Sequence, residues 1–330
     1  MVDVVTCQRK SPILTPSSIP CLRRLPTINV TAGCALGCTY CYIQGYSCYP
    51  GPDRVLLYEN TPDLVEHELR HRRRKPRRVY FSPSSDAFQY LPQVQAVTLR
   101  TMTVLLDAGV QVAFLTKGFV TQPFLRLFAT APRNVFGQVG ITTLDGNLWR
   151  RFEPRTASPQ MRLDCIRSLV GLGVSVTARL DPLIPDVTDT RENLSPLLES
   201  LAAARVREVA ASYLFLRPAI ASRLSAQLEC LRDIPVSPAN WSPQAFADGR
   251  TGGQMIDLAE RERRFTSIQQ FARGLDIQVN VCRCKNPEFA GTGCGIAGPD
   301  DLPSRADIPL LLFAEVRRDM FTDSNLEPSG

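Results

Sequence analysis

The stretch "TINVTAGCALGCTYCYIQGYSC", residues 27–48, places three thiols at intervals of four and three residues directly after a predicted β-strand. The three are Cys34, Cys38 and Cys41, and Cys48 follows seven residues later. Gly33 and Gly37 permit the positive φ angles that a backbone needs to wrap a compact core. The spacing therefore predicts a metal-binding loop at the end of a strand.

Two kinds of metal centre fit three thiolates in one loop. A structural zinc site needs a fourth ligand, which Cys48 could supply. An iron–sulfur cluster held by three thiolates instead leaves one iron free to bind a small molecule. The spacing leaves both alternatives open, and the strand in front together with the predicted barrel behind favours the cluster.

Short β-branched runs alternate with amphipathic helical patterns along the rest of the chain. The runs occupy residues 27–33, 77–84, 109–118, 135–146, 173–182, 207–218 and 276–284. Such alternation is typical of a parallel sheet with helical crossovers. A count of six or seven strands predicts an α/β fold with a partial (β/α) barrel, and an open doubly wound sheet is the alternative. No Gly-x-Gly-x-x-Gly follows any strand, which disfavours dinucleotide binding.

We expect three parts along the chain. Residues 1–27 are Pro-rich and patternless and form an N-terminal arm, residues 28–281 form the barrel, and residues 282–330 form a cysteine-containing extension packed on it. The Pro- and Gly-rich residues 233–256 predict a lid or long loop.

Glycines mark the predicted ends of three helices. Gly109, Gly173 and Gly274 each stand just before a β-branched run, where a glycine C-cap ends a helix. The repeating unit is therefore helix, glycine turn and strand.

The composition is that of a globular protein, with 330 residues, 44% apolar and 21% charged. The N-terminus has no apolar segment typical of a signal peptide, and no run reaches the roughly 18 apolar residues of a membrane helix. We therefore expect a soluble, cytoplasmic protein. Eleven cysteines, an odd and unevenly clustered number, argue against a disulfide framework and for metal ligation.

The net charge of +6 comes from one segment. "RHRRRKPRR", residues 70–78, carries seven Arg or Lys, which leaves +6 − 7 = −1 for the rest of the chain. A solvated helix end explains such a segment most simply, and phosphate or nucleic-acid binding is the alternative.

Polar residues follow the predicted strands where ligands gather in either architecture. They are Ser82, Ser84, Ser85, Asp86, Thr116, Lys117, Thr142, Thr143, Asp145, Arg179, Asp181, Tyr213 and Cys282. The first cysteine group follows the first strand, so we expect it on the same face.

"CALGCTYCY" resembles the Cys-x3-Cys-x2-Cys motif of the radical S-adenosylmethionine (SAM) enzymes, whose aromatic position before the third cysteine is Tyr40 here. The resemblance implies that Cys34, Cys38 and Cys41 hold a [4Fe-4S] cluster whose open iron binds SAM. One electron into the sulfonium would release methionine and a 5′-deoxyadenosyl radical that abstracts hydrogen from a substrate. It also implies a reductant such as flavodoxin or ferredoxin.

Within that superfamily, "CTYCYIQ", "SSDAFQ", "FLTKG" and "FEPRTASPQMRLDCIRSLVGLGVSVTARLDPLIP" are similar to the spore photoproduct lyase-like, or DNA repair photolyase-like, group over about residues 28–216. The resemblance implies a SAM site lined by Ser85, Asp86, Lys117 and Thr142, and a hydrogen relay through Tyr40 and Tyr42. Arg179 could reach a carboxylate or phosphate, which is argued from its position alone.

One departure concerns the hydrogen-donating cysteine that the lyase carries just before its Ser-Asp pair. This chain reads Ser82-Pro83-Ser84-Ser85-Asp86 there, without a thiol. We therefore expect a substrate other than spore photoproduct.

A second cysteine group, Cys282, Cys284 and Cys294, lies in "CRCKNPEFAGTGC" after the last predicted strand. Its position predicts an auxiliary iron–sulfur cluster near the substrate site. Zinc and three unrelated buried thiols are the alternatives. Cys7, Cys21 and Cys48 are candidate fourth ligands, while Cys165 and Cys230 fall in helical patterns and are predicted packing residues.

His67-Glu68-Leu69-Arg70-His71 matches the His-Glu-x-x-His pattern of zinc proteases. The helix runs directly into the basic segment, and burying that charge would be very unfavourable. We interpret the match as a coincidence on an exposed helix.

The sequence thus predicts a radical SAM enzyme of the photolyase-like group whose substrate is not identified, with a nucleic acid, a peptide and a small metabolite as the candidates. The alternative is a non-catalytic zinc or iron–sulfur protein that binds nucleic acid through residues 70–78.

Overall fold

The computed structural model describes residues 2–17, 22–218, 220–221, 224, 241–245, 252–289 and 293–296. Its strands are β1 (Asp3–Cys7), β2 (Thr15–Pro16), β3 (Pro26–Ile28), β4 (Thr31–Ala32), β5 (Arg54–Tyr58), β6 (Arg78–Phe81), β7 (Gln111–Thr116), β8 (Val135–Gly140), β9 (Ser175–Leu183), β10 (Glu208–Tyr213), β11 (Trp241–Ala245), β12 (Gly252–Ile256) and β13 (Gln278–Val281). Its α-helices are α1 (Thr61–His71), α2 (Pro92–Asp107), α3 (Gln122–Thr130), α4 (Gly146–Phe152), α5 (Pro159–Gly171), α6 (Arg191–Ala203) and α8 (Leu258–Arg273). Two 3₁₀ turns, η2 (Tyr42–Gly45) and η3 (Pro132–Asn134), complete it.

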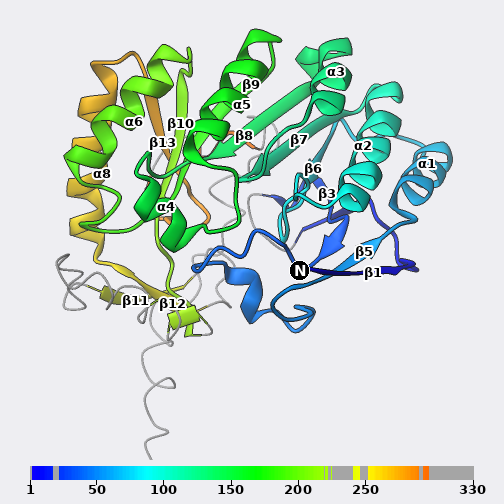
Figure 1. Ribbon diagram of the computed structural model, residues 1–330, viewed down its shortest axis with the longest axis horizontal. Helices are drawn as coiled ribbons and strands as arrows, with labels where there is room; N and C mark the ends of the chain where they lie inside the picture. The colour runs from blue at the N-terminus through cyan, green and yellow to red at the C-terminus, as the bar shows by residue number, and fades with distance from the viewer. Residues whose placement is uncertain are drawn as a thin grey trace, which may run out of the picture.

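The main sheet has the order β13-β10-β9-β8-β7-β6-β3-β2. All neighbours from β3 to β13 are parallel, and only β2 is antiparallel. Within the described residues this gives seven parallel strands, as the sequence predicts. The helices lie along one side of the curved sheet (Figure 1), so the doubly wound alternative is wrong and the partial (β/α) barrel is confirmed.

Alternation of side chains along the strands separates the two faces of the sheet. On β6, Val79 and Phe81 pack in the large core beneath the helices, whereas Tyr80 between them points to the opposite, inner face. Ala113 and Ala210 share that inner face with the second cysteine group. The interior of the partial barrel is therefore where chemistry-bearing residues gather.

The N-terminal residues are more regular than the sequence suggests. β1 pairs in parallel with β5, and β4 pairs antiparallel with β5, forming a separate three-stranded sheet. The expectation of a patternless arm is thus wrong for residues 3–7, because pairing with a distant strand supplies what local patterning does not show.

Part of the predicted lid is also regular. β11 and β12 pair antiparallel over five residues each, although Pro243 and two glycines weaken the strand signal in the sequence. Residues 233–240 and 246–251 lie outside the described residues.

The glycine caps hold at two of three positions. Gly109 and Gly173 have φ values of +74° and +79°, as a left-handed helix end requires. Gly274 ends α8 with φ −62°, and Asp276 takes the positive φ two residues later.

No helix in the described part of the chain is long and apolar enough to cross a membrane.

The histidine pair on α1 does not form a metal site. His67 and His71 are exposed, and the Nδ1 atom of His71 bonds the carbonyl oxygen of His67. The carboxylate of Glu68 accepts hydrogen bonds from the backbone N–H groups of Ile13 and Leu14. Glu68 therefore holds the N-terminal segment against α1, which gives it a structural role in the fold.

We predict that Glu68→Ala lowers the free energy of unfolding by about 1–3 kcal/mol, because it leaves two buried N–H groups without an acceptor. Chemical denaturation measures the change. Glu66→Ala is the matched control, since its ion pair with Arg70 is exposed and contributes less than about 1 kcal/mol. Equal effects of the two substitutions would contradict the anchoring role.

Candidate SAM and iron–sulfur site

The first cysteine loop connects β4 to η2, and only glycine fits two of its positions. Gly33 and Gly37 have φ values of +82° and +61°. A Cβ at Gly33 would lie 2.6 Å from the carbonyl oxygen of Arg54, and one at Gly37 would lie 2.6 Å from the guanidinium of Arg155. The tight turn that the sequence predicts is therefore present.

The loop is held against the end of α4. Thr39 N–H donates to the carbonyl oxygen of Phe152 at 2.9 Å, and Gln44 Nε2 donates to the carbonyl oxygen of Cys38 at 3.2 Å. The buried Gln89 side chain accepts from the N–H of Ala35 at 2.7 Å. These bonds fix the backbone on both sides of the thiols.

The three thiols lie together in a desolvated site. Burial raises the pKa values of Cys34, Cys38 and Cys41, and the charges of Cys41 and Cys38 raise that of Cys34 further. A metal that binds them must displace thiol protons, so its affinity falls as pH falls.

A single metal ion does not suit this arrangement. Among the described residues, no three His, Cys, Asp or Glu side chains are placed to share one ion. In an iron–sulfur cluster each thiolate binds a different iron, so the sulfurs need not converge on one point. Three thiolates from one loop are the ligand set that a cluster with one open iron requires.

The loop after β6 holds two buried hydroxyls with no partner. Within the described residues, only four buried side-chain nitrogen or oxygen atoms lack a hydrogen bond: Arg9 Nε, Ser82 Oγ, Ser85 Oγ and Arg283 Nε. Ser82 has φ 58°, a strained conformation for a residue with a Cβ. A buried hydroxyl without a hydrogen-bond partner is unfavourable unless a bound molecule supplies one. Ser85 is a residue for which the sequence predicts contact with SAM.

Asp86 uses its carboxylate within the protein. It accepts from the N–H of Phe88 and of Lys117, both at 2.8 Å, and from the hydroxyl of Thr116 at 2.9 Å. These contacts indicate that Asp86 positions the end of β7, while its predicted contact with SAM stays a prediction.

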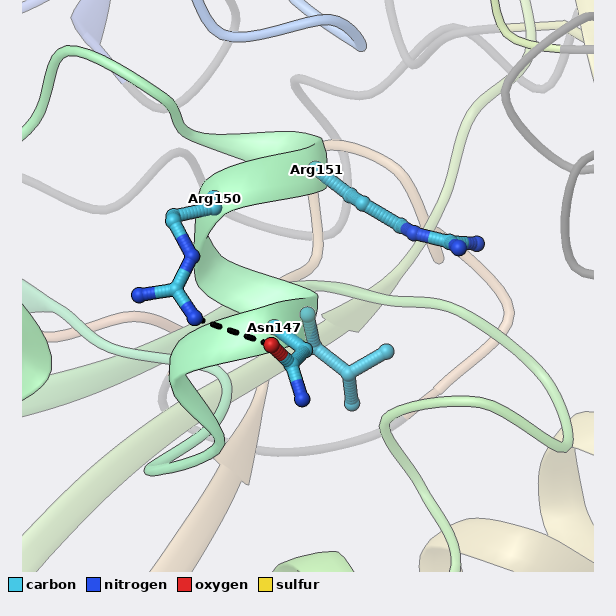
Figure 2. Close-up of a pocket in the computed structure, with 4 residues that line it drawn as sticks. Asn147, Arg150 and Arg151 are labelled. Carbon is cyan, nitrogen blue, oxygen red and sulfur yellow. Dashed lines mark hydrogen bonds between the residues drawn. The ribbon is translucent and has the colours of Figure 1, made fainter.

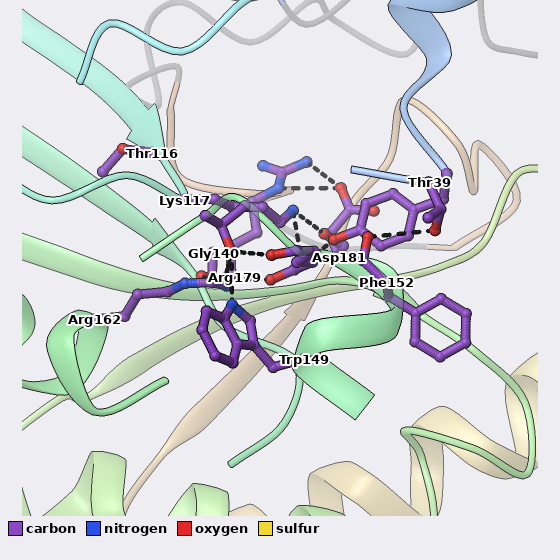
Figure 3. A network of polar contacts seen from close by, with 12 residues as sticks. Thr39, Thr116, Lys117, Gly140, Trp149, Phe152, Arg162, Arg179 and Asp181 are labelled. Atoms are coloured by element: carbon purple, nitrogen blue, oxygen red, sulfur yellow. Dashed lines mark hydrogen bonds and ion pairs between the residues drawn. The ribbon is translucent and has the colours of Figure 1, made fainter. Parts of the chain in front are cut away.

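A polar network around Lys117, Arg179 and Asp181 lies between the first cysteine loop and the interior of the barrel (Figure 3). Tyr40, beside Cys41, donates its hydroxyl hydrogen to Glu153, and Lys117 Nζ lies 3.8 Å from the same carboxylate. Lys117 Nζ also donates to the carbonyl oxygen of Asp181 at 2.8 Å. Charged groups therefore run without interruption from the first thiol loop into the barrel.

The second half of the network ends on a thiol. Arg179 Nη2 donates to Asp181 Oδ2 at 2.9 Å and lies 3.5 Å from the sulfur of Cys282. Lys285 pairs with the other oxygen of Asp181. Burial would raise the pKa of Asp181, but Lys285, Arg179 and Lys117 together hold it well below its usual range.

The remaining predicted residues fall into different surroundings. Tyr42 donates its hydroxyl hydrogen to the carbonyl oxygen of Pro83, within the stretch 82–86 that contains no thiol. Thr142 is buried after β8, and its carbonyl oxygen accepts from Asn193 at 2.8 Å. Arg179 belongs with the second cysteine group, away from the unpaired Ser85.

Sequence reasoning missed several members of the network. Glu153 follows α4 and gives no strand-end signal, although it lies in the quoted stretch "FEPRTASPQ". Arg162, only 1% exposed, pairs with it. Asp181 stands at a predicted strand end, where the sequence gives it no role, and Lys285 directly follows Cys284.

The second cysteine group lies partly deeper than predicted. Cys282 follows β13 at the carboxyl edge, and its N–H donates to the carbonyl oxygen of Ala211. Cys294 lies further inside, where Gln138 of β8 donates to its carbonyl oxygen. Cys21 and Cys230 lie outside the described residues, while Cys165 packs in the main core as predicted.

A cavity of about 380 Å³ opens beside α4, lined by Asn147, Leu148, Arg150 and Arg151. Figure 2 shows Arg150 turned back to Asn147 Oδ1, at 2.9 Å, while Arg151 extends from the other side of the helix. α4 follows β8 at the same edge as the first cysteine loop, so these arginines add positive charge beside it.

The fold and the site together define a partial-barrel protein with a cluster-type thiol loop at the carboxyl edge. The family model of the Radical SAM superfamily matches residues 28–195, and the chain belongs to this superfamily. Membership implies a [4Fe-4S] cluster and SAM as partner, and the reductive cleavage of SAM is the chemistry that the superfamily shares.

Curated relatives match the chain in part. The Mycobacterium tuberculosis protein "Uncharacterized protein Rv2578c" is 29% identical over 213 residues, which are 61% of this chain and 63% of that protein. "Radical SAM Nalpha-GlyT isomerase" of Pseudomonas phage M6 is 25% identical over 171 residues, 52% of this chain and 35% of that protein. The chain thus spans less than two thirds of the length of either relative.

Solved structures share the fold. A mutant of spore photoproduct lyase superposes with a TM-score of 0.65 at 14% identity, over 84% of this chain and 81% of that one. Spore photoproduct lyase complexed with dinucleoside spore photoproduct gives a TM-score of 0.62 at 14% identity over the same shares. This likeness confirms the predicted lyase-like fold.

We predict that Glu153→Gln lowers the free energy of unfolding by roughly 3 kcal/mol at pH 7, because it leaves the buried Arg162 without its carboxylate. Burial by itself would raise the pKa of Glu153, but Arg162 and then Lys117 hold it below its usual value. The stabilisation is therefore complete above about pH 4.3, the ordinary Glu pKa, and is lost as pH falls through the lower folded pKa.

Denaturation of wild type and variant at several pH values measures this difference. Asp164→Asn is the matched control, since its pair with Arg167 is about half exposed and contributes less than about 1 kcal/mol. A difference between wild type and Glu153→Gln that does not shrink in acid would contradict the ionised pair.

Proposed function

We propose that the protein cleaves SAM reductively and uses the resulting radical to abstract hydrogen from a substrate related to nucleic acid. The observation that carries the proposal is the thiol loop of Cys34, Cys38 and Cys41 at the carboxyl edge, with the unpaired hydroxyl of Ser85 on the neighbouring strand end. A [4Fe-4S] cluster bound there would supply one electron to the SAM sulfonium and release a 5′-deoxyadenosyl radical.

Each residue near the loop has a task in this proposal. The three thiolates hold the cluster, and Ser85 donates a hydrogen bond to SAM. Lys117 is partly buried with its Nζ over the Tyr40 ring at 5.2 Å, where its charge can attract the SAM carboxylate. Glu153 positions Lys117 and the tyrosine.

The substrate class is proposed from charge and likeness. Arg150 and Arg151 flank a cavity at the catalytic edge, which suits the phosphates of a nucleic acid. The lyase with a similar fold was solved with a dinucleoside. Residues 82–86 contain no thiol, which supports a different fate for the substrate radical.

Two partners complete the proposal. A low-potential reductant such as flavodoxin or ferredoxin would deliver the electron, since SAM cleavage consumes one. We also propose that Cys282, Cys284 and Cys294 bind an auxiliary iron–sulfur cluster, independently of the first site.

We predict that anaerobically purified protein, reduced with dithionite and given SAM, releases 5′-deoxyadenosine, and that Cys38→Ala abolishes this because the cluster loses a ligand. Chromatography of the quenched reaction measures the product. Cys165→Ala is the control, since this thiol packs beneath the helices away from the loop. A wild-type protein that forms no 5′-deoxyadenosine with any reductant would rule out the function.

The basic segment lies on the wrong edge to guide substrate to this site. Residues 70–77 precede β6 and therefore stand at the amino ends of the parallel strands, opposite the cysteine loop. The segment can bind phosphate without serving catalysis.

We predict that replacing Arg150 and Arg151 with Gln weakens binding of a DNA oligonucleotide and reduces the salt dependence of binding by about one unit of slope for each phosphate that the variant no longer neutralises. Titrations at several salt concentrations measure both quantities. The control replaces Arg73 and Arg74 with Gln, which removes the same charge from the opposite edge. An equal or larger effect in the control would show that the catalytic edge is not the binding surface.

A further inference from the structure

We propose that Cys282, Cys284 and Cys294 form a second iron–sulfur site of the [4Fe-4S] type, and that it lies inside the partial barrel with Arg179 as hydrogen-bond donor to one of its sulfurs. The proposal deepens the auxiliary site named above. It does not depend on SAM cleavage.

The three thiols share one buried cluster although nine residues lie between the second and the third. The Cys282 thiol interacts with the thiols of both Cys284 and Cys294. Their residues are 2%, 7% and 6% exposed, respectively. Gly293 and Gly295, with φ values of +76° and +74°, turn the chain on both sides of Cys294. Two separate turns therefore present their thiols to one buried place.

The inner face of the sheet carries small side chains at that place. Ala113 of β7 and Ala210 of β10 belong to the same buried cluster as the three thiols, and Tyr80 joins it from β6. Alanine side chains obstruct an inorganic core less than larger apolar side chains would.

Side chains of Arg179, Gln138 and Asn286 donate hydrogen bonds around the second cysteine group, as side chains around metal ligands commonly do. Arg179 Nη2 lies 3.5 Å from Cys282 Sγ, and Arg179 Nη1 donates to Gln138 Oε1 at 3.1 Å. Gln138 in turn donates to the carbonyl oxygen of Cys294, and Asn286 Nδ2 donates to that of Cys282 at 2.9 Å. Donors of this kind orient ligands and tune cluster potentials. Thiols that served only as packing residues would not require a buried guanidinium beside them.

Charge and coordination favour a cluster over zinc. A cluster with three thiolate ligands is anionic, and burying it requires nearby cations. Arg179 is 7% exposed, and the Lys285 side chain, 18% exposed, lies next in the chain to Cys284. Structural zinc requires four ligands around one point. Among the described residues, three cysteines share this buried cluster, one ligand fewer than structural zinc requires.

The decisive variant replaces Cys34, Cys38 and Cys41 together with Ala in the full-length chain. It cannot hold the first cluster or cleave SAM, so any iron it retains belongs to the second site. Purified without oxygen, it should remain brown and contain about four irons and four acid-labile sulfides per chain. Wild type should contain about twice as much, and Cys165→Ala should equal wild type.

Three results would overturn the proposal. They are a colourless variant without iron, a variant with about one zinc in place of iron, and a wild type with no more than about four irons. The wild-type count remains decisive even where the triple variant folds poorly. A wild type that retains the second cluster but forms no 5′-deoxyadenosine would refute the proposed function alone.

The contact of Arg179 is tested separately, in the variant that lacks the first three cysteines. Arg179→Gln should make the reduction potential of the remaining cluster more negative, because removing a neighbouring cation disfavours adding an electron. Electron paramagnetic resonance of samples poised at defined potentials measures this. An unchanged potential would contradict the placement of Arg179 beside the cluster.

Discussion

The buried carboxylate of Asp181 is the group on which the interior of this protein depends. It binds Arg179 and Lys285 through its two oxygens, and its own carbonyl oxygen accepts from Lys117. An uncompensated carboxylate at this depth would be strongly destabilising, but here two cations pair with its oxygens and the charge of Lys117 lies close by. Those cations come from three segments of the chain, after β7, on β9 and after β13. One electrostatic constraint thus draws the carboxyl ends of distant strands to the same place.

The sequence predicts the barrel well because its signals are local and repeated. Each β-branched run from residue 77 to residue 284 forms a parallel strand, and Gly109 and Gly173 end the helices before two of them. β1 and β5 escape prediction because they are stabilised by pairing with each other across about fifty residues, which no local pattern reveals. The β11–β12 hairpin contains Pro243, and a proline within a segment is local evidence against a strand.

The sequence predicts site residues that must stand at fixed intervals along the chain. It does not predict charged residues that meet only in the folded structure. Cys34, Cys38 and Cys41 must come from one tight loop, so their intervals are visible in the sequence. Glu153 needs only to reach Lys117 in space, and nothing in its neighbourhood along the chain distinguishes it from any exposed glutamate. Glu68 is a second example. It lies in a sequence that matches a zinc-protease motif, but its carboxylate accepts hydrogen bonds from two backbone N–H groups about 55 residues away in the sequence.

Positive charge lies at both edges of the sheet, but it comes from different segments of the chain. Parallel strands place every carboxyl end at one edge, so the cysteine loop, Lys117 and the α4 arginines share it. The seven basic residues at 70–78 dominate the net charge of the chain, yet they lead into the amino end of β6. Screening limits their field to roughly 8–10 Å at physiological salt, too short to guide a substrate to the opposite edge. The net charge of the chain therefore reflects the amino edge, whereas the strand direction places the cysteine loop, Lys117 and the α4 arginines at the carboxyl edge.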